Sequence, residues 1–154
     1  MTSRTKHDWD IHFMKRAKLI SEMSKDPSTK VGAIIVDDSH YTVADGYNGF
    51  PRGIEDDGRL DNRAIKYDII IHGEMNAILT AGRQGKPVIG CTLYTWPLPP
   101  CIRCATAIVQ SGIKRVVSFY PDAEQAKRWL ESCQQAQDIL EEGGVEVVWY
   151  ENNL

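Results

Sequence analysis

The feature that most constrains this chain is the segment 98–105, Leu-Pro-Pro-Cys-Ile-Arg-Cys-Ala, together with the upstream triplet His72-Gly-Glu74. Proline suits the first turn of a helix, because its missing N–H would have no helical partner there. We therefore expect Cys101 and Cys104 at a helix N-terminus and, because they are three residues apart, on one face of it. The helix dipole favours negative charge at this end and lowers thiol pKa, so the segment predicts a pair of thiolates.

Two thiolates and one imidazole form a ligand set for Zn²⁺, and catalytic zinc sites leave the fourth position open for water. With His72, Cys101 and Cys104 as ligands, Glu74 remains as a carboxylate beside the metal, placed for general acid–base work. The pattern H-x-E followed by P-C-x-x-C is the signature of zinc deaminases. The sequence therefore predicts one catalytic Zn²⁺ per chain, with Glu74 as the catalytic residue.

Other interpretations of the cysteine pair stay open. A C-x-x-C pair can be a redox pair or half of a structural zinc site. A redox pair would not need the H-x-E triplet, and a closed structural site would need a fourth ligand, whereas Cys91 and Cys133 stand alone in the sequence. A third alternative is a non-catalytic, zinc-stabilised interaction module in which Glu74 only complements the helix dipole.

Composition limits the partners and the location of the chain. Its 154 residues are 42% hydrophobic and 25% charged, which is typical of a globular domain. The net charge of −3 gives no basic surface, so we expect no nucleic-acid partner. No apolar run reaches the length of a signal core or a membrane span, so we expect no membrane partner and a reducing, cytoplasmic location.

Hydrophobic periodicity predicts helices that alternate with strands. We expect helices over 8–24, 72–82, 101–112 and 121–143, and strands over 31–36, 41–47, 88–95, 114–120 and 145–150. The last helix is expected to bury Ala126, Leu130, Cys133 and Leu140. The charged segment 51–71 has no period and is expected to be a long loop. This order implies an α/β fold with parallel strand pairs and helices on both faces of the sheet.

Several stretches resemble the deoxycytidylate (dCMP) deaminase family of the cytidine deaminase superfamily. They are S-K-D-P-S-T-K-V-G-A at 24–33, G-Y-N-G-F-P at 46–51, H-G-E-M-N-A-I at 72–78, T-L-Y at 92–94, P-C-I-R-C-A at 100–105 and Q-S-G-I at 110–113. One departure is the triplet H-G-E, where H-A-E is commoner in the family. The resemblance implies a three-layer α/β/α fold with a mixed five-stranded sheet, the first two strands antiparallel and the last two parallel. We expect residues 1–154 to form a single zinc-dependent deaminase domain of the CMP/dCMP type.

The resemblance also implies an activity, which is hydrolytic deamination of dCMP to dUMP and ammonia, supplying dUMP for thymidylate synthesis. It implies activation by dCTP, inhibition by dTTP, Mg²⁺ accompanying a triphosphate effector, and a homo-oligomer, either a hexamer or one built from dimers. The alternative is a deaminase of another cytosine or purine nucleoside or base with the same zinc site, such as a guanine, riboflavin-precursor or tRNA-adenosine deaminase.

The resemblance assigns further residues to nucleotide binding. The substrate-binding residues it implies are Asn48, Ser24, Asp26 and Thr29, although each could instead be a turn or helix-end residue. The implied allosteric residues are Gly46, Tyr47, Gly49 and Pro51. The candidate cations for the 5′-phosphate are Lys30, Arg52 and Arg115.

Overall fold

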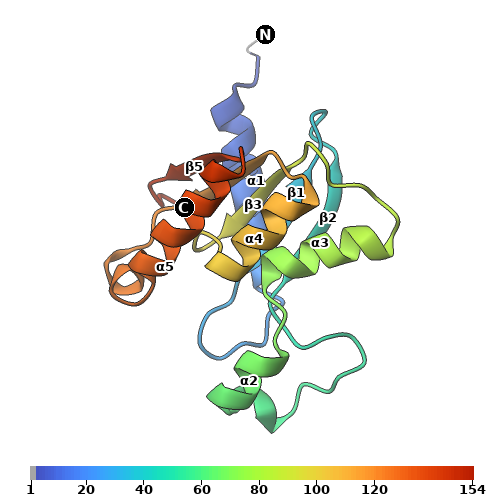
Figure 1. Ribbon diagram of the computed structural model, residues 1–154, viewed down its shortest axis with the longest axis vertical. Helices are drawn as coiled ribbons and strands as arrows, with labels where there is room; N and C mark the ends of the chain where they lie inside the picture. Colours follow the sequence, from blue (N-terminus) through green and yellow to red (C-terminus); the bar gives the residue numbers. More distant parts are fainter. Residues whose placement is uncertain (1–2) are drawn as a thin grey trace.

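The computed structural model describes residues 3–154, so residues 1 and 2 of the predicted domain lie outside the described part (Figure 1). Its five strands form one sheet in the order β2-β1-β3-β4-β5. Strand β1 is antiparallel to both β2 and β3, whereas β3, β4 and β5 run parallel. The strands are β1 Gly32–Val36, β2 Thr42–Tyr47, β3 Thr92–Trp96, β4 Arg115–Phe119 and β5 Glu146–Tyr150. The helices are α1 Lys6–Ser21, the 3-10 helix η1 Gly58–Asp61, α2 Arg63–Ile69, α3 Gly73–Arg83, α4 Ile102–Ser111 and α5 Ala123–Glu142.

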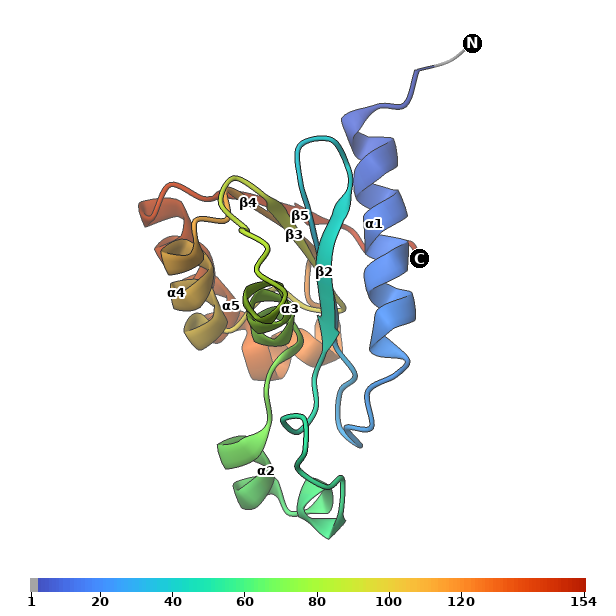
Figure 2. The same cartoon turned by 90° about the vertical axis from the view of Figure 1, so that its right-hand side faces the viewer.

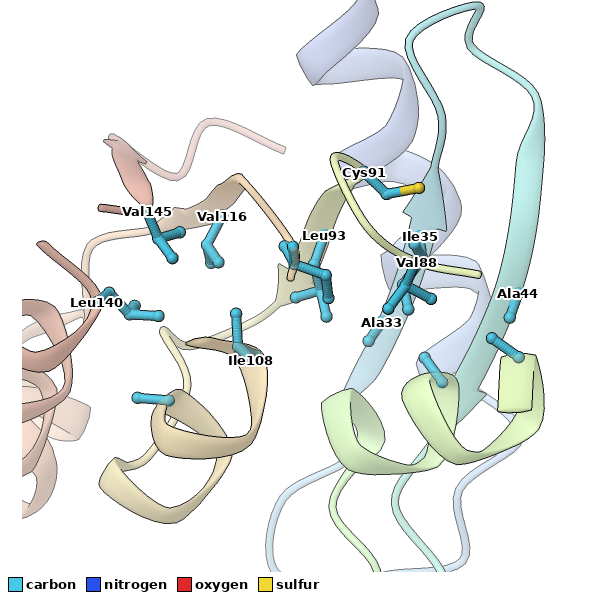
Figure 3. Close-up of a cluster of buried hydrophobic side chains, with 14 of the residues drawn as sticks. Ala33, Ile35, Ala44, Val88, Cys91, Leu93, Ile108, Val116, Leu140 and Val145 are labelled. Atoms are coloured by element: carbon cyan, nitrogen blue, oxygen red, sulfur yellow. The ribbon is translucent and has the colours of Figure 1, made fainter. Parts of the chain in front are cut away.

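Helices cover both faces of the sheet, which confirms the predicted three-layer α/β/α fold. Helix α1 lies on one face, and α3, α4 and α5 lie on the other (Figure 2). A hydrophobic cluster that includes Leu93, Ile108 and Leu140 fills the layer under α3, α4 and α5 (Figure 3). A second cluster, which includes Phe13 and Phe119, fills the layer under α1. Every residue of β1 is buried, so its sequence is one continuous apolar run and does not alternate between apolar and polar residues.

Three parts of the predicted secondary structure are wrong. Segment 51–71 was expected to be a loop, but it contains η1 and α2. Both helices are too short to show a hydrophobic period, and each starts at a capping residue. The Asp57 side chain accepts from the N–H of Arg59, and the Asn62 side chain accepts from the N–H of Ile65. The first helix also ends at Ser21 rather than at residue 24, and the third strand begins at Thr92 rather than at residue 88.

The buried stripe of α5 differs in part from the predicted one, since Ala126 is only half-buried and Ala136 is buried in addition. Cys133 and Leu140 are buried as expected, but Leu130 is 59% exposed. Stepping back from Cys133 by one helical turn of 3.6 residues leads closer to Trp129 than to Leu130. Trp129 is accordingly half-buried and belongs to the lining of a cavity described below.

Gly32 lies where α1 crosses β1 at very short range. A Cβ atom at this position would be 2.0 Å from the carbonyl oxygen of Ala17 and 2.6 Å from the amide nitrogen of Ser21. Both are backbone atoms, which cannot rotate away, so Gly32→Ala should lower the free energy of unfolding by about 3 kcal/mol. Urea unfolding monitored by circular dichroism measures this change.

Gly82 offers a matched control in α3. A Cβ atom there would meet nothing within 4 Å. Gly82→Ala should therefore raise the free energy of unfolding by about 0.5–1 kcal/mol, because alanine loses less conformational freedom in a helix. A Gly32→Ala variant as stable as the unsubstituted protein would contradict the close approach of α1 and β1.

None of the helices within residues 3–154 combines the length and the apolar character needed to cross a membrane.

Candidate active site

Three of the predicted site residues come from the N-termini of two neighbouring helices. His72 is the N-cap residue of α3, Cys101 is the N-cap residue of α4, and Cys104 lies in the first turn of α4. Neither N-cap side chain forms a capping hydrogen bond. Instead the three side chains meet, with Nδ1 of His72 3.4 Å from Sγ of Cys101 and 3.4 Å from Sγ of Cys104.

The spacing of these donor atoms fits a zinc ion. Zinc–nitrogen and zinc–sulfur bonds of about 2.0 and 2.3 Å at tetrahedral angles place nitrogen and sulfur about 3.5 Å apart. The three ligand atoms all lie within 4.8 Å of one another, and no other group of this kind occurs in the part of the chain that the structure describes. Three protein ligands leave one position of a tetrahedron for water or substrate, as in catalytic rather than structural zinc sites.

The two thiols are electrostatically unequal. A hydrogen bond from the Cys104 thiol holds the pKa of Cys101 well below its usual value, and a hydrogen bond with His72 acts in the same direction, against the effect of burial. The pKa of Cys104 is raised, because its thiol is the donor in that bond and because it is buried near Glu74. A divalent cation held between the two sulfurs would displace the remaining proton, since the thiolate is the ligating form.

Glu74 lies beside this group in the first turn of α3 and is only 4% exposed. Its Oε1 accepts a hydrogen bond of 3.1 Å from Oγ1 of Thr95, at the end of β3. Burial raises the pKa of Glu74, while the nearby His72 imidazole and the hydrogen bond from Thr95 oppose this rise. A buried carboxyl with a raised pKa is suited to take up and return a proton near neutral pH. Thr95 could not be predicted from the sequence, because nothing in a strand pattern marks one threonine as a carboxylate partner.

A cavity extends from these side chains toward α2 and α5. Figures 1 and 2 both show α2 standing beyond the end of the sheet at which α3 begins. The lining residues outside the His/Cys/Cys group and Glu74 include Asp26, Ser28, Thr29, Asn48, Lys66, Tyr67, Leu98, Pro99, Arg128, Trp129, Ser132 and Cys133. The walls from α2 and α5 were not predicted, because these segments meet only through the tertiary fold.

Asn48 lines this cavity, but its side-chain amide is bound by the chain itself. Its Oδ1 accepts from the N–H of Val31 at 2.8 Å. Its Nδ2 donates to the carbonyl of Thr29 at 2.8 Å and to Oδ2 of Asp26 at 3.3 Å. Both amide hydrogens therefore have acceptors, and Asn48 fixes the loop over 26–31 that forms one wall of the cavity.

The other three predicted substrate residues surround Asn48. Asp26 and Thr29 line the cavity, whereas Ser24 does not. Oγ of Ser24 donates to the carbonyl of Asn48 at 2.8 Å and thus supports the wall from behind. Asp26 forms a buried ion pair with Nζ of Lys66 at 3.1 Å, which ties α2 to the same wall.

The four predicted allosteric residues lie outside the cavity lining. Gly46 permits the packing of β2 on α3, because a Cβ atom there would be 2.6 Å from the amide nitrogen of Ala77. Gly49 exchanges two backbone hydrogen bonds with Ile71, of 3.1 and 2.8 Å. Tyr47 is exposed and Pro51 is half-buried.

The three candidate phosphate-binding cations are not among the residues that line the cavity. Lys30 and Arg52 are exposed and do not line it. Arg115 is buried elsewhere, with Nη2 bound to Oδ2 of Asp10 at 2.7 Å.

Comparison with known proteins relates both the fold and the motifs to one family. Residues 7–120 match the family model described as the cytidine and deoxycytidylate deaminase zinc-binding region. An uncharacterized deaminase in the luxG 3′ region of Aliivibrio fischeri is 40% identical over 92% of each chain. The deoxycytidylate deaminase of Mus musculus is 39% identical over 77% of this chain and 70% of its own length. The dCMP deaminase of cyanophage S-TIM5, solved in complex with dCMP and dUMP, is 27% identical with a TM-score of 0.74, covering 96% of this chain and 100% of the phage chain.

Proposed function

The chain belongs to the cytidine and deoxycytidylate deaminase family, and we propose that it catalyses the hydrolytic deamination of dCMP to dUMP and ammonia. The observation that carries this proposal is the buried Glu74 carboxyl beside the converging donor atoms of His72, Cys101 and Cys104. Three of these residues, His72, Glu74 and Cys101, line one cavity. The dCMP and dUMP complex of the similar phage enzyme supports a pyrimidine nucleotide as the substrate.

The roles of the residues follow from their chemistry. His72, Cys101 and Cys104 would hold a Zn²⁺ ion, which would supply Lewis acidity and lower the pKa of a water molecule toward neutral pH. Glu74 takes up a proton from this water, protonates ring N3 of cytosine and later passes a proton to the departing amine. Thr95 orients the Glu74 carboxylate through its hydrogen bond to Oε1. The C4–N bond of the base breaks as oxygen takes the place of the amine, which leaves as ammonia.

The finer parts of the predicted function rest on the family resemblance. These are activation by dCTP, inhibition by dTTP, Mg²⁺ with a triphosphate effector, assembly into a hexamer or other homo-oligomer, and the supply of dUMP for thymidylate synthesis. The allosteric assignment of Gly46, Tyr47, Gly49 and Pro51 likewise stays a prediction. For Gly46 and Gly49, the packing and backbone pairing described above give each glycine a structural role as well.

A substrate panel tests the proposed function. Ammonia release by the zinc-loaded protein should be measured on dCMP, deoxycytidine, CMP and guanine. We expect kcat/KM for dCMP to exceed that for deoxycytidine by at least about tenfold, because hydrogen bonds to a charged phosphate contribute about 1.5–3 kcal/mol each. Strong activity on deoxycytidine with none on dCMP would assign a nucleoside deaminase instead. Stoichiometric zinc with no ammonia release on any substrate would favour the non-catalytic module.

A further inference from the structure

We propose that Arg128 of α5 binds the 5′-phosphate of the substrate and makes the enzyme selective for nucleotides over nucleosides. This inference rests on the proposed function for the identity of the substrate. It assigns this role to a cation that lines the cavity, which none of the three cations singled out in the sequence does.

The charges in the cavity wall single out Arg128. Apart from the His72 imidazole, two cationic side chains line the cavity, Lys66 and Arg128. Lys66 is 4% exposed, and its Nζ is bound by Oδ1 of Asp26 at 3.1 Å and Oγ of Ser28 at 3.3 Å. Its charge is therefore neutralised by a neighbour within the fold.

Arg128 has no such partner. Within residues 3–154 no hydrogen bond or ion pair reaches its guanidinium group, which lies over the ring of Trp129 with 5.5 Å between Cζ and the ring centroid. A cation held against an aromatic face keeps its donors available to a ligand. A guanidinium group can also donate two parallel hydrogen bonds to one phosphate.

Two parts of the cavity wall differ in burial and charge, and this difference matches the base and the phosphate of a nucleotide. Glu74 is buried at one part of the wall, whereas Arg128 is exposed. The base must reach Glu74 to react, and a phosphate dianion is repelled by carboxylates at short range. The phosphate, at the other end of the nucleotide from the base, therefore falls toward the exposed wall. Ser132 lies one turn beyond Arg128 on the same face of α5 and also lines the cavity, where its hydroxyl adds a further donor.

Comparison of two substrates in a charge-removing variant tests this assignment. Arg128→Gln should lower kcat/KM for dCMP by about 10- to 100-fold, mainly through KM, because a charge-assisted hydrogen bond is lost. Its kcat/KM for deoxycytidine should stay unchanged, and Arg128→Lys should recover part of the loss on dCMP. Lys127→Gln is the matched control, since Lys127 is exposed on the same helix and does not line the cavity. It should change neither substrate by more than about twofold.

The outcomes separate this inference from the proposed function. Equal losses on dCMP and deoxycytidine, or no loss on dCMP, would overturn the role of Arg128 while leaving deamination intact. Titration with inorganic phosphate followed by ³¹P NMR gives a readout that needs no catalysis. Saturable binding that Arg128→Gln abolishes and Lys127→Gln retains supports the phosphate site, even if no substrate is deaminated and the proposed function fails. A lack of saturable phosphate binding by the unsubstituted protein would count against the site.

Discussion

Replacing Glu74 by glutamine is expected to lower kcat for dCMP by at least about 10²- to 10⁴-fold, the usual contribution of general acid–base catalysis. Glutamine has nearly the same shape, and its amide oxygen can still accept the hydrogen bond that Thr95 donates to Oε1 of Glu74. It cannot take up or return a proton, so the loss isolates proton transfer from the packing of the site. Steady-state ammonia release measures kcat.

Two controls distinguish a loss of proton transfer from a loss of zinc or a general effect of removing one negative charge. The zinc content of Glu74→Gln, measured by atomic absorption, should match that of the unsubstituted protein, because the three donor atoms come from other residues. Glu22→Gln removes the same charge at an exposed position after α1 and should leave kcat unchanged. Near-normal turnover by Glu74→Gln with full zinc would refute the role assigned to this carboxylate.

The residues that could be found from the sequence are those whose signal is local. Cys101 and Cys104 share a helix face through their spacing alone, and His72 and Glu74 lie together in one triplet. The structure brings these four side chains together because both helices begin at the same end of the sheet. The strands could also be predicted from local sequence, since β-branched apolar runs such as residues 31–36 need no tertiary information to be recognised.

The walls of the cavity could not be predicted in the same way. Lys66 reaches Asp26 across forty residues of chain, and Arg128 enters the cavity because α5 packs beside α4. A mid-helix cation gives the same sequence pattern whether it faces solvent or a ligand. The misassignment of Leu130 shows the same limit, because a small change in the phase of a helix decides whether Leu130 or Trp129 faces inward.

Asp10 is another residue whose role could not be predicted from the sequence. Its replacement is expected to cause the largest loss of stability. It is fully buried in α1. Its Oδ1 accepts from the Tyr94 hydroxyl and from Nη1 of Arg115, both at 2.8 Å. Its Oδ2 accepts from Nη2 of Arg115 and from the Tyr150 hydroxyl, both at 2.7 Å. One carboxylate thus joins α1 to β3, β4 and β5.

Asp10→Asn should lower the free energy of unfolding by about 3–5 kcal/mol, because it leaves the guanidinium of Arg115 buried without its counter-charge. Glu146 compensates little, since its carboxylate is half-exposed and 3.4 Å from Nε of Arg115. In a double-mutant cycle with Arg115→Met, the double variant should be more stable than the sum of the single losses by about 1–3 kcal/mol, as no unpaired buried charge remains. Strict additivity in urea unfolding would contradict this coupling.

The pH dependence of the same variant tests the charge itself. Burial opposes ionisation of Asp10, but the hydrogen bonds from Arg115, Tyr150 and Tyr94 outweigh it, so the pKa of Asp10 lies below its usual value. A carboxyl whose pKa is lower in the folded than in the unfolded state stabilises the fold above the unfolded value of about 3.9 and loses this effect as pH falls through the folded value. The difference in unfolding free energy between the unsubstituted protein and Asp10→Asn should therefore be constant between about pH 5 and 7 and shrink below about pH 4. A difference that widened on acidification would mean that the Asp10 carboxyl is protonated in the folded protein.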